Sequence, residues 1–198
     1  MVTRVAATLG LVIMLVIGAI GAPARTSAAG ADLVVNGGFE QPMLSPGSFG
    51  VFGAIEDWTT AYGAGIELQN AIFVAHGGAQ VVELDSHSSS AMYQDIATVP
   101  GVSDTVSFWV SPRPGVNAED NVLSASWDGR RLGTISSGPG GSVTAWTQYA
   151  YTVTATSSLT QLQFADAGVS NSLGSLLDDV SVVENEIQYG ICTLYDAS

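Results

Sequence analysis

Basic residues and cysteines are scarce in this chain of 198 residues. It contains no lysine, five arginines and one cysteine, against 18 acidic residues, and its formal net charge is −13. Such a charge makes nucleic acid and anionic membrane surfaces poor partners, and it suits neutral ligands and divalent cations. Because Cys192 stands alone, no internal disulfide can form, and we interpret this residue near the C-terminus as incidental.

Only one long apolar run is present, and it lies at the N-terminus. Met1 to Arg4 form a basic start, residues 5–22 are apolar, and small residues follow up to Ala29. This pattern predicts a secretory signal peptide over residues 1–29 and therefore a secreted, extracellular protein, with the cell surface as a further location. An uncleaved membrane anchor is the alternative, but the glycines and the small-residue end favour cleavage.

The remaining sequence lacks any helical period with capping residues. Short apolar stretches are separated by Gly, Pro, Asn and Ser, which predicts an all-β jelly-roll or sandwich domain over residues 30–184 and a tail over 185–198. Residues 41–53 are expected to be a loop. The expected strands lie at residues 34–35, 65–68, 71–74, 80–84, 91–96, 104–111, 122–127, 131–135, 144–155, 159–165 and 176–183.

The last of these strands carries an acidic residue in an apolar pattern. Apolar and polar residues alternate from Leu176 to Val182, so Asp178 is predicted to share the core face with Leu176, Val180 and Val182. An unpaired buried charge costs several kcal/mol or more. Asp178 should therefore lie beside a metal ion, beside several backbone N–H donors, or where the strand meets water.

Motifs at both ends and in the middle of the domain carry a family resemblance. They are Val35-Asn36-Gly37-Gly38-Phe39-Glu40, Trp58, Ile66-Glu67-Leu68, residues 76–85, Tyr93-Gln94-Asp95-Ile96, Val106-Ser107-Phe108-Trp109 and residues 177–182. This set resembles the galactose-binding-like jelly rolls of carbohydrate-binding modules and, over residues 33–184, the DUF642 family of extracellular proteins associated with cell walls. Ser103-Asp104 replaces a tyrosine usual in the family, and the cysteines of plant members are missing.

The resemblance implies a structural calcium ion between the first and last strands. Glu40 and Asp178 would supply carboxylate oxygens, and backbone carbonyls near Gly38 and His76 would complete the shell. Calcium accepts six to eight oxygen ligands in irregular geometry, which a loop that meets a strand end can provide. In the alternative interpretation, Asp178 caps backbone N–H groups and Glu40 is merely exposed.

Aromatic residues on polar strand faces are candidates for carbohydrate binding. Sugars stack on aromatic rings while short polar side chains bind their hydroxyls. Trp109 is the first candidate, because it alternates with the apolar residues of its strand; Tyr93 and Tyr62 are second choices, and Gln94, Asp95 and Arg113 are candidate hydrogen-bonding partners. Packing of Trp109 under a loop is an equal alternative. Trp58 and Trp146 are expected to fill core edges, and Trp127 shares its parity with Leu123 and Ala125.

Catalytic patterns are weak. Asp85, Ser86 and His87 are adjacent in an expected strand end, so their side chains cannot converge as a triad requires. No convincing pair of facing carboxylates is evident, and His76 and His87 lack the spacing of a zinc site. We therefore expect a secreted, non-catalytic protein that binds neutral or uronic-acid polysaccharide. An adhesive protein that contacts other extracellular proteins is the alternative; a buried pair of facing carboxylates would support a third hypothesis, a hydrolase.

Overall fold

The computed structural model describes residues 30–185 of the protein. The predicted signal peptide, Cys192 and nearly all of the predicted tail lie outside the described residues. Within the described range there is no helix at all, and thus none that is long and apolar enough to cross a membrane.

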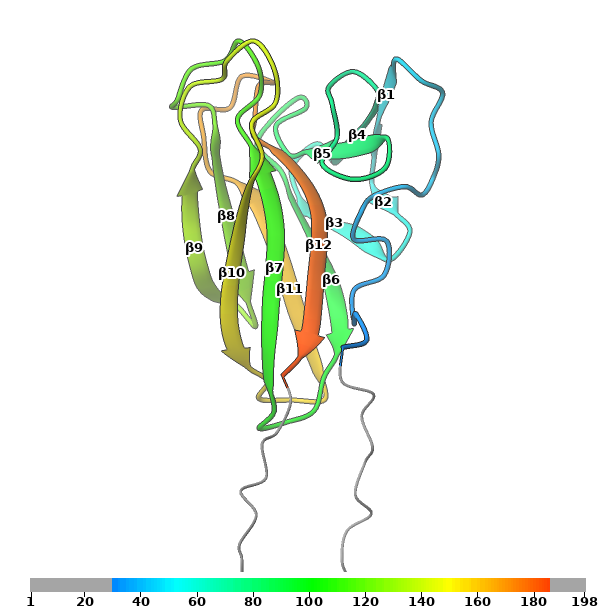
Figure 1. Ribbon diagram of the computed structural model, residues 1–198, viewed down its shortest axis with the longest axis vertical. Coiled ribbons are helices and arrows are strands. Elements are labelled where there is room, and N and C mark those ends of the chain that lie inside the picture. The colour runs from blue at the N-terminus through cyan, green and yellow to red at the C-terminus, as the bar shows by residue number, and fades with distance from the viewer. Residues whose placement is uncertain (1–29, 186–198) are drawn as a thin grey trace, which may run out of the picture.

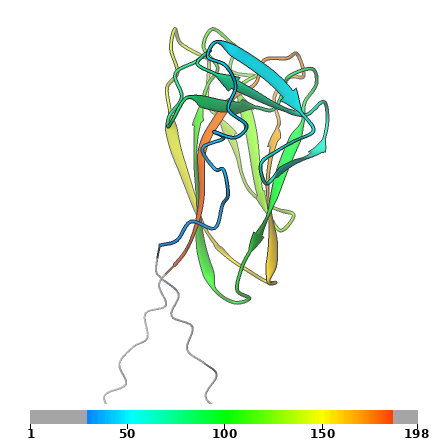
Figure 2. The ribbon, with the colours of Figure 1, turned by 90° about the vertical axis from the view of Figure 1, so that its right-hand side faces the viewer.

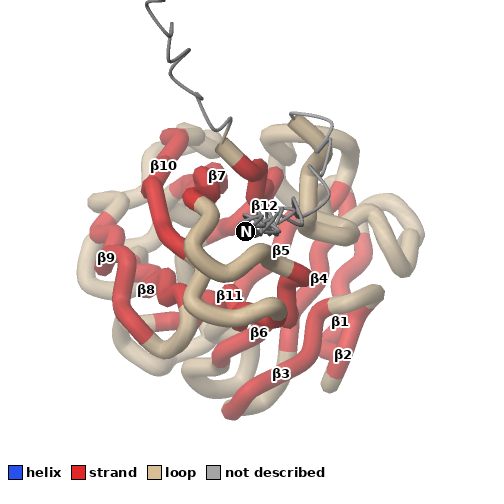
Figure 3. The backbone as a smooth tube through the Cα atoms, turned by 90° about the horizontal axis from the view of Figure 1, so that it is seen from below, coloured by secondary structure: helices blue, strands red, loops and turns tan. Residues whose placement is uncertain are grey.

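Two six-stranded antiparallel sheets face each other in a β-sandwich, as Figure 3 shows along its long axis. This architecture confirms the predicted all-β jelly roll. Sheet A consists, in spatial order, of β1 (Ser48–Phe52), β4 (Ile66–Asn70), β5 (Gln80–Glu83), β12 (Leu176–Glu184), β7 (Ser103–Ser111) and β10 (Thr147–Thr154). Sheet B consists of β2 (Ala54–Ile55), β3 (Trp58–Tyr62), β6 (Ala91–Ala97), β11 (Leu159–Asp166), β8 (Val122–Trp127) and β9 (Arg130–Ser136).

The core lies between the sheets and follows the alternation of the strands. In β7, Val106, Phe108 and Val110 are fully buried, while Ser107 and Trp109, which alternate with them, are partly exposed. The Phe108 ring meets the Phe164 ring of the other sheet edge to face at 4.9 Å between centroids. Trp58 is also fully buried in this core, as predicted. Burial of large aromatic side chains is the main stabilising term in such a sandwich.

The two ends of the sandwich differ. Residues 30 and 185, where the described part of the chain begins and ends, lie at the lower end in Figures 1 and 2, while the loops between β7 and β8, β9 and β10, and β11 and β12 gather at the opposite end. Loops on a rigid scaffold are where binding residues often lie. The turn between β8 and β9 lies at the lower end.

Several short segments differ from the sequence predictions, and β2 and β3 form where no strand was expected. Residues 34–35 form no strand, and this part of the chain joins β12 through a bridge between Asp32 and Val183 and through a hydrogen bond from the Val180 N–H to the Gly37 carbonyl. Residues 48–52, expected to be loop, form the edge strand β1. Residues 71–74 are a loop, because Ala71 adopts a positive φ of 51° that ends β4. Non-glycine residues rarely adopt this conformation, and a sequence pattern does not reveal it.

A β-bulge corrects the predicted face of Asp178. The register between β12 and β7 shifts between Asp178 and Ser181, and Asp179 adopts a φ of 45°. The extra residue reverses the alternation. As a result Leu177 and Val180 enter the core, and Asp178 lies on the outer side of sheet A, where it is nevertheless fully buried.

Candidate functional site

Asp178 is buried because the loop between β4 and β5, residues 71–79, covers it. Its Oδ2 accepts hydrogen bonds from the backbone N–H groups of His76 (2.8 Å) and Gly77 (3.1 Å), and its Oδ1 accepts one from Asp179 (2.8 Å). The predicted backbone donors are therefore confirmed. Burial raises the pKa of the Asp178 carboxyl to about 7, and the backbone donors only partly offset this.

The carboxylates predicted to bind calcium accept hydrogen bonds from backbone N–H groups in this structure. Oε1 of Glu40 accepts backbone N–H groups from Ala79 (2.8 Å) and Gln80 (3.0 Å), and His76 presents a donor to Asp178. These carboxylates are thus directed at N–H groups, which a cation would have to displace. No cluster of three or more His, Cys, Asp or Glu side chains that could hold a metal occurs among residues 30–185. Calcium at Glu40, Asp178, Gly38 and His76 stays a prediction.

Trp109 packs under the same loop. The His76 ring stacks on the Trp109 ring at 3.8 Å between centroids and 18° between planes, and Asp179 Oδ2 lies 2.5 Å from His76 Nδ1. One face of the Trp109 ring is therefore covered by the protein itself. Trp146, expected at a core edge, is also on this outer surface, where its Nε1 donates to the Val74 carbonyl (3.1 Å).

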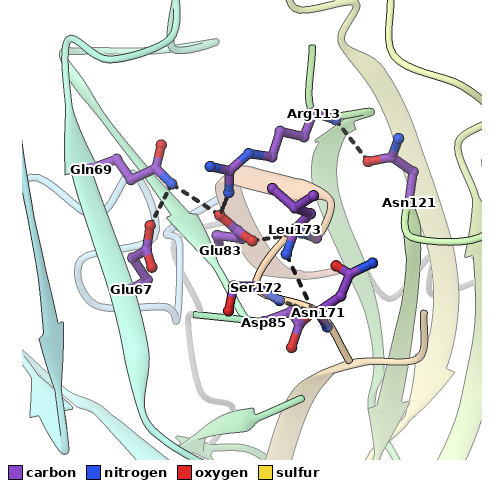
Figure 4. Close-up of polar contacts among 10 residues, drawn as sticks. Glu67, Gln69, Glu83, Asp85, Arg113, Asn121, Asn171, Ser172 and Leu173 are labelled. Atoms are coloured by element: carbon purple, nitrogen blue, oxygen red, sulfur yellow. Dashed lines mark hydrogen bonds and ion pairs between the residues drawn. The ribbon is translucent and has the colours of Figure 1, made fainter. Parts of the chain in front are cut away.

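Arg113 is engaged by a buried carboxylate of β5 (Figure 4). Its guanidinium forms an ion pair with Glu83 and lies 5.5 Å from the centroid of the Phe73 ring. Oε1 of Glu83 also accepts the backbone N–H of Gly174 (2.6 Å). Burial raises the pKa of Glu83 to about 8, although Arg113 opposes this shift. Arg113 therefore fixes a loop to the sheet and is not a free ligand for sugar.

The structure corrects the expectation that no two carboxylates face each other. Glu67 of β4 lies directly opposite Glu83 of β5, and the Gln69 amide donates to both, at 2.8 Å and 3.0 Å. This is the feature that would support a hydrolase. However, Glu67 is 8% exposed and Glu83 is 0% exposed, so a polymeric substrate cannot reach them. The pair is therefore closed off from solvent in this structure.

An open groove lies instead on the outer face of sheet B, beside β2, β3 and β6. It has a volume of about 590 Å³, and Tyr93 is the one aromatic residue among those that line it, together with Asp57, Thr59, Gln94 and Asp95. Gln94 shapes its wall, because its amide bonds the backbone N–H (2.9 Å) and carbonyl (2.8 Å) of Val35. Tyr93 and Asp95 are thus brought together as candidate ligands, whereas the Gln94 side chain is 4% exposed and its amide is already bonded to Val35.

Polar side chains continue from this groove across the sheet. Tyr93 is paired with Thr59 of β3 and with Gln163 of β11, and Asp95 is paired with Gln161. Residues opposite each other across strands lie on one face. In the sequence, Gln161 and Gln163 alternate with the buried residues of β11, and this alternation indicates a polar outer face on the strand. Tyr62 is 52% exposed but does not line the groove.

Comparison with known sequences finds distant relatives. No family model matches the chain, so membership of the DUF642 family stays a prediction. The multifunctional-autoprocessing repeats-in-toxin of Vibrio vulnificus is 28% identical over 153 residues, covering 75% of this chain and 3% of the toxin. The protein of the same name from Vibrio cholerae is 27% identical over 161 residues, covering 79% and 3%. The chain thus spans about 3% of the length of these relatives.

Solved structures share the fold at low sequence identity. A Stig cyclase from Fischerella sp. TAU superposes with a TM-score of 0.57 and 12% identity, covering 78% of this chain and 97% of that chain. The MgGH51 α-L-arabinofuranosidase gives a TM-score of 0.53 and 16% identity, covering 81% and 27%. A family 35 carbohydrate-binding module from Clostridium thermocellum gives 0.47 and 13%, covering 68% and 97%. Likeness at this identity concerns the fold alone.

Proposed function

We propose that this protein is a secreted, non-catalytic module that binds extracellular or cell-wall polysaccharide in the groove on sheet B. The observation that carries the proposal is the open groove of about 590 Å³ in which Tyr93 is flanked by Thr59, Asp57 and Asp95. An aromatic ring among short polar side chains is the combination that binds a sugar ring and its hydroxyls. The similarity to a short segment of two far longer toxins supports a module that is built into larger chains.

The groove suits a neutral section of a polysaccharide. Asp57 and Asp95 are exposed at its edge, and carboxylates accept hydrogen bonds from sugar hydroxyls. The surface is acidic overall, so polyanions would be repelled from this face unless a basic residue is close by. Binding in such an open groove fits an internal stretch of polymer, because nothing closes its ends.

The test is a glycan array together with a pull-down on insoluble polysaccharides, using protein produced from the full sequence. Tyr93→Ala removes the proposed stacking ring. Tyr62→Ala is the matched control, because Tyr62 is another exposed tyrosine of sheet B that lies outside the groove. We expect Tyr93→Ala to weaken binding at least tenfold, since stacking of a ring contributes on the order of 1.5 kcal/mol, while Tyr62→Ala binds normally. Absence of binding by the folded wild type, or equal loss in both variants, refutes the proposal.

One observation favours a second candidate function, adhesion to another protein. Val74 and Val143 are 72% and 65% exposed, and Val74 lies beside Trp146, whose Nε1 bonds its carbonyl. Exposed apolar side chains beside an aromatic ring are typical of protein contacts. Sedimentation velocity of the wild type and of the double variant Val74→Asp, Val143→Asp tests whether copies of this chain associate through these valines. A dimer that is lost in the double variant supports adhesion, and a wild type that is monomeric at all concentrations excludes self-association as the form of adhesion.

A further inference from the structure

A second groove lies between the outer edges of the two sheets, where β9 and β10 face each other. It has a volume of about 360 Å³, within the size range of ligand pockets. Sheet B contributes Trp127, Arg130 and Arg131, and sheet A contributes Thr152 and Thr154. In the strand order of sheet B, β9 lies at the opposite edge from β2 and β3, so this groove is separate from the one around Tyr93.

The hairpin between β8 and β9 places the arginines at this groove. Asp128 and Gly129 both have positive φ angles, 50° and 72°, as a tight two-residue hairpin turn requires. The turn sets Arg130 directly opposite Trp127. The strands predicted at residues 122–127 and 131–135 are thus confirmed as the two arms of a hairpin, which places Arg130 opposite Trp127 and Arg131 opposite Ser126.

These arginines are unusual in so acidic a protein. The ion pairs within residues 30–185 are Arg113 with Glu83 and His76 with Asp179, so Arg130 and Arg131 form none there. Asp128, the nearest acid in sequence, instead accepts a hydrogen bond from the Thr156 hydroxyl (2.9 Å). Both arginines are exposed. Two free guanidinium groups at one groove form a site that attracts an anion.

Trp127 lines the same groove. Its side chain is 4% exposed, and its Nε1–H is buried without a hydrogen-bond acceptor among the described residues. Because this nitrogen has almost no accessible surface, a ligand in the groove would lie beside the indole ring rather than bond its N–H.

We propose that the groove between β9 and β10 binds an acidic sugar, a uronate residue of a glycan. A carboxylate would pair with Arg130 and Arg131, and the hydroxyls of Thr152 and Thr154 would bond the ring hydroxyls. Apart from Asp128, every polar side chain that lines the groove can donate a hydrogen bond, and this matches a ligand rich in oxygen acceptors. The proposal is independent of the groove around Tyr93.

Isothermal titration calorimetry with trigalacturonate, with neutral galactotriose and with sodium sulfate tests this site on the whole protein. We expect trigalacturonate to bind, and Arg130→Gln with Arg131→Gln to lower its affinity at least tenfold, because hydrogen bonds between charged groups contribute on the order of 1.5–3 kcal/mol. Both arginines are exposed, so the double variant should unfold at the wild-type temperature. Tyr62→Ala is the control, because Tyr62 is exposed and lines neither groove, and it should bind trigalacturonate as the wild type does; Tyr93→Ala is measured beside it.

A spectroscopic readout locates the ligand. Trp127→Phe keeps an aromatic ring and removes the N–H, so it identifies the Trp127 indole signal in ¹H–¹⁵N spectra. That signal should shift on addition of trigalacturonate and stay in place with galactotriose. No binding, binding that depends on Tyr93 rather than on the arginines, or sulfate binding as tight as trigalacturonate overturns the proposal; the last outcome would indicate a simple anion site.

Discussion

Asp85 offers the sharpest test of how this fold holds its loops. The residue lies two positions after the end of β5 and is fully buried, and its Oδ2 accepts three consecutive backbone N–H groups, from Asn171 (2.8 Å), Ser172 (2.9 Å) and Leu173 (3.3 Å). These donors belong to the loop between β11 and β12, some 86 residues away in sequence (Figure 4). Asp85→Ala removes the acceptor for all three at once.

The size of the effect follows from these contacts. A hydrogen bond to a charged group contributes about 1.5–3 kcal/mol. The loop residues are exposed, so water replaces part of what is lost, and we expect Asp85→Ala to lower the free energy of unfolding by roughly 3 kcal/mol. Asp85→Asn keeps one carbonyl oxygen toward the loop and should cost only about 1 kcal/mol.

Urea unfolding measures the free energies, and hydrogen exchange of the amides of residues 171–173 shows where the change occurs. Exchange at these amides should accelerate strongly in Asp85→Ala, while core amides change only in step with global stability. Glu56→Ala is the control, because it removes one acid from an exposed position. A loss below about 1 kcal/mol with unchanged exchange at residues 171–173 would refute the anchoring role.

Three further predictions concern pH, metal and backbone packing. Burial raises the pKa of Asp178 to about 7 and that of Glu83 to about 8. The free energy of unfolding should therefore be highest near pH 4–5 and fall by on the order of 4 kcal/mol per group as the pH rises through 8. Urea midpoints at pH 5 and 8.5 measure this fall, and Asp178→Asn should make the midpoint depend less on pH. Removal of calcium with EDTA should leave the melting temperature unchanged, since Glu40 and Asp178 already bind backbone donors; a clear drop would establish the metal. Gly37→Ala would place a methyl group 1.9 Å from the Val180 carbonyl oxygen and should destabilise the protein by about 2–3 kcal/mol in the same unfolding assay, whereas a neutral result would contradict the packing.

The sequence predicts strands well where one face is buried. The alternation of β7 and the hairpin of β8 and β9 could be derived because each apolar residue has a fixed place relative to the core. The bulge at Asp179 could not, because a left-handed residue inside a strand leaves no mark in the pattern of apolar residues. A shift of one residue was enough to assign Asp178 to the wrong face.

The candidate sites show a different limit of sequence analysis. Parity shows that Trp109 and Tyr93 both leave the core, but it cannot show which of them another segment covers. His76, which stacks on Trp109, lies 33 residues before it in the chain, and its position depends on Asp178 far downstream. Tyr93 has no such cover within the described residues and lines an open groove. Long-range packing of a loop, rather than strand pattern, therefore decides which aromatic residue is available.

The scarcity of basic residues follows from the same mode of loop attachment. Glu40, Asp85 and Asp178 each accept two or more backbone N–H groups from loops distant in sequence, a role that needs acceptors and that lysine, which only donates, cannot fill. The acidic composition is thus partly structural, since these carboxylates are used inside the fold. Against that background, two adjacent arginines at one groove, with no ion pair in the part of the chain that the structure describes, are not needed to balance charge locally. Their exposed positions at a groove fit the anionic ligand that we propose.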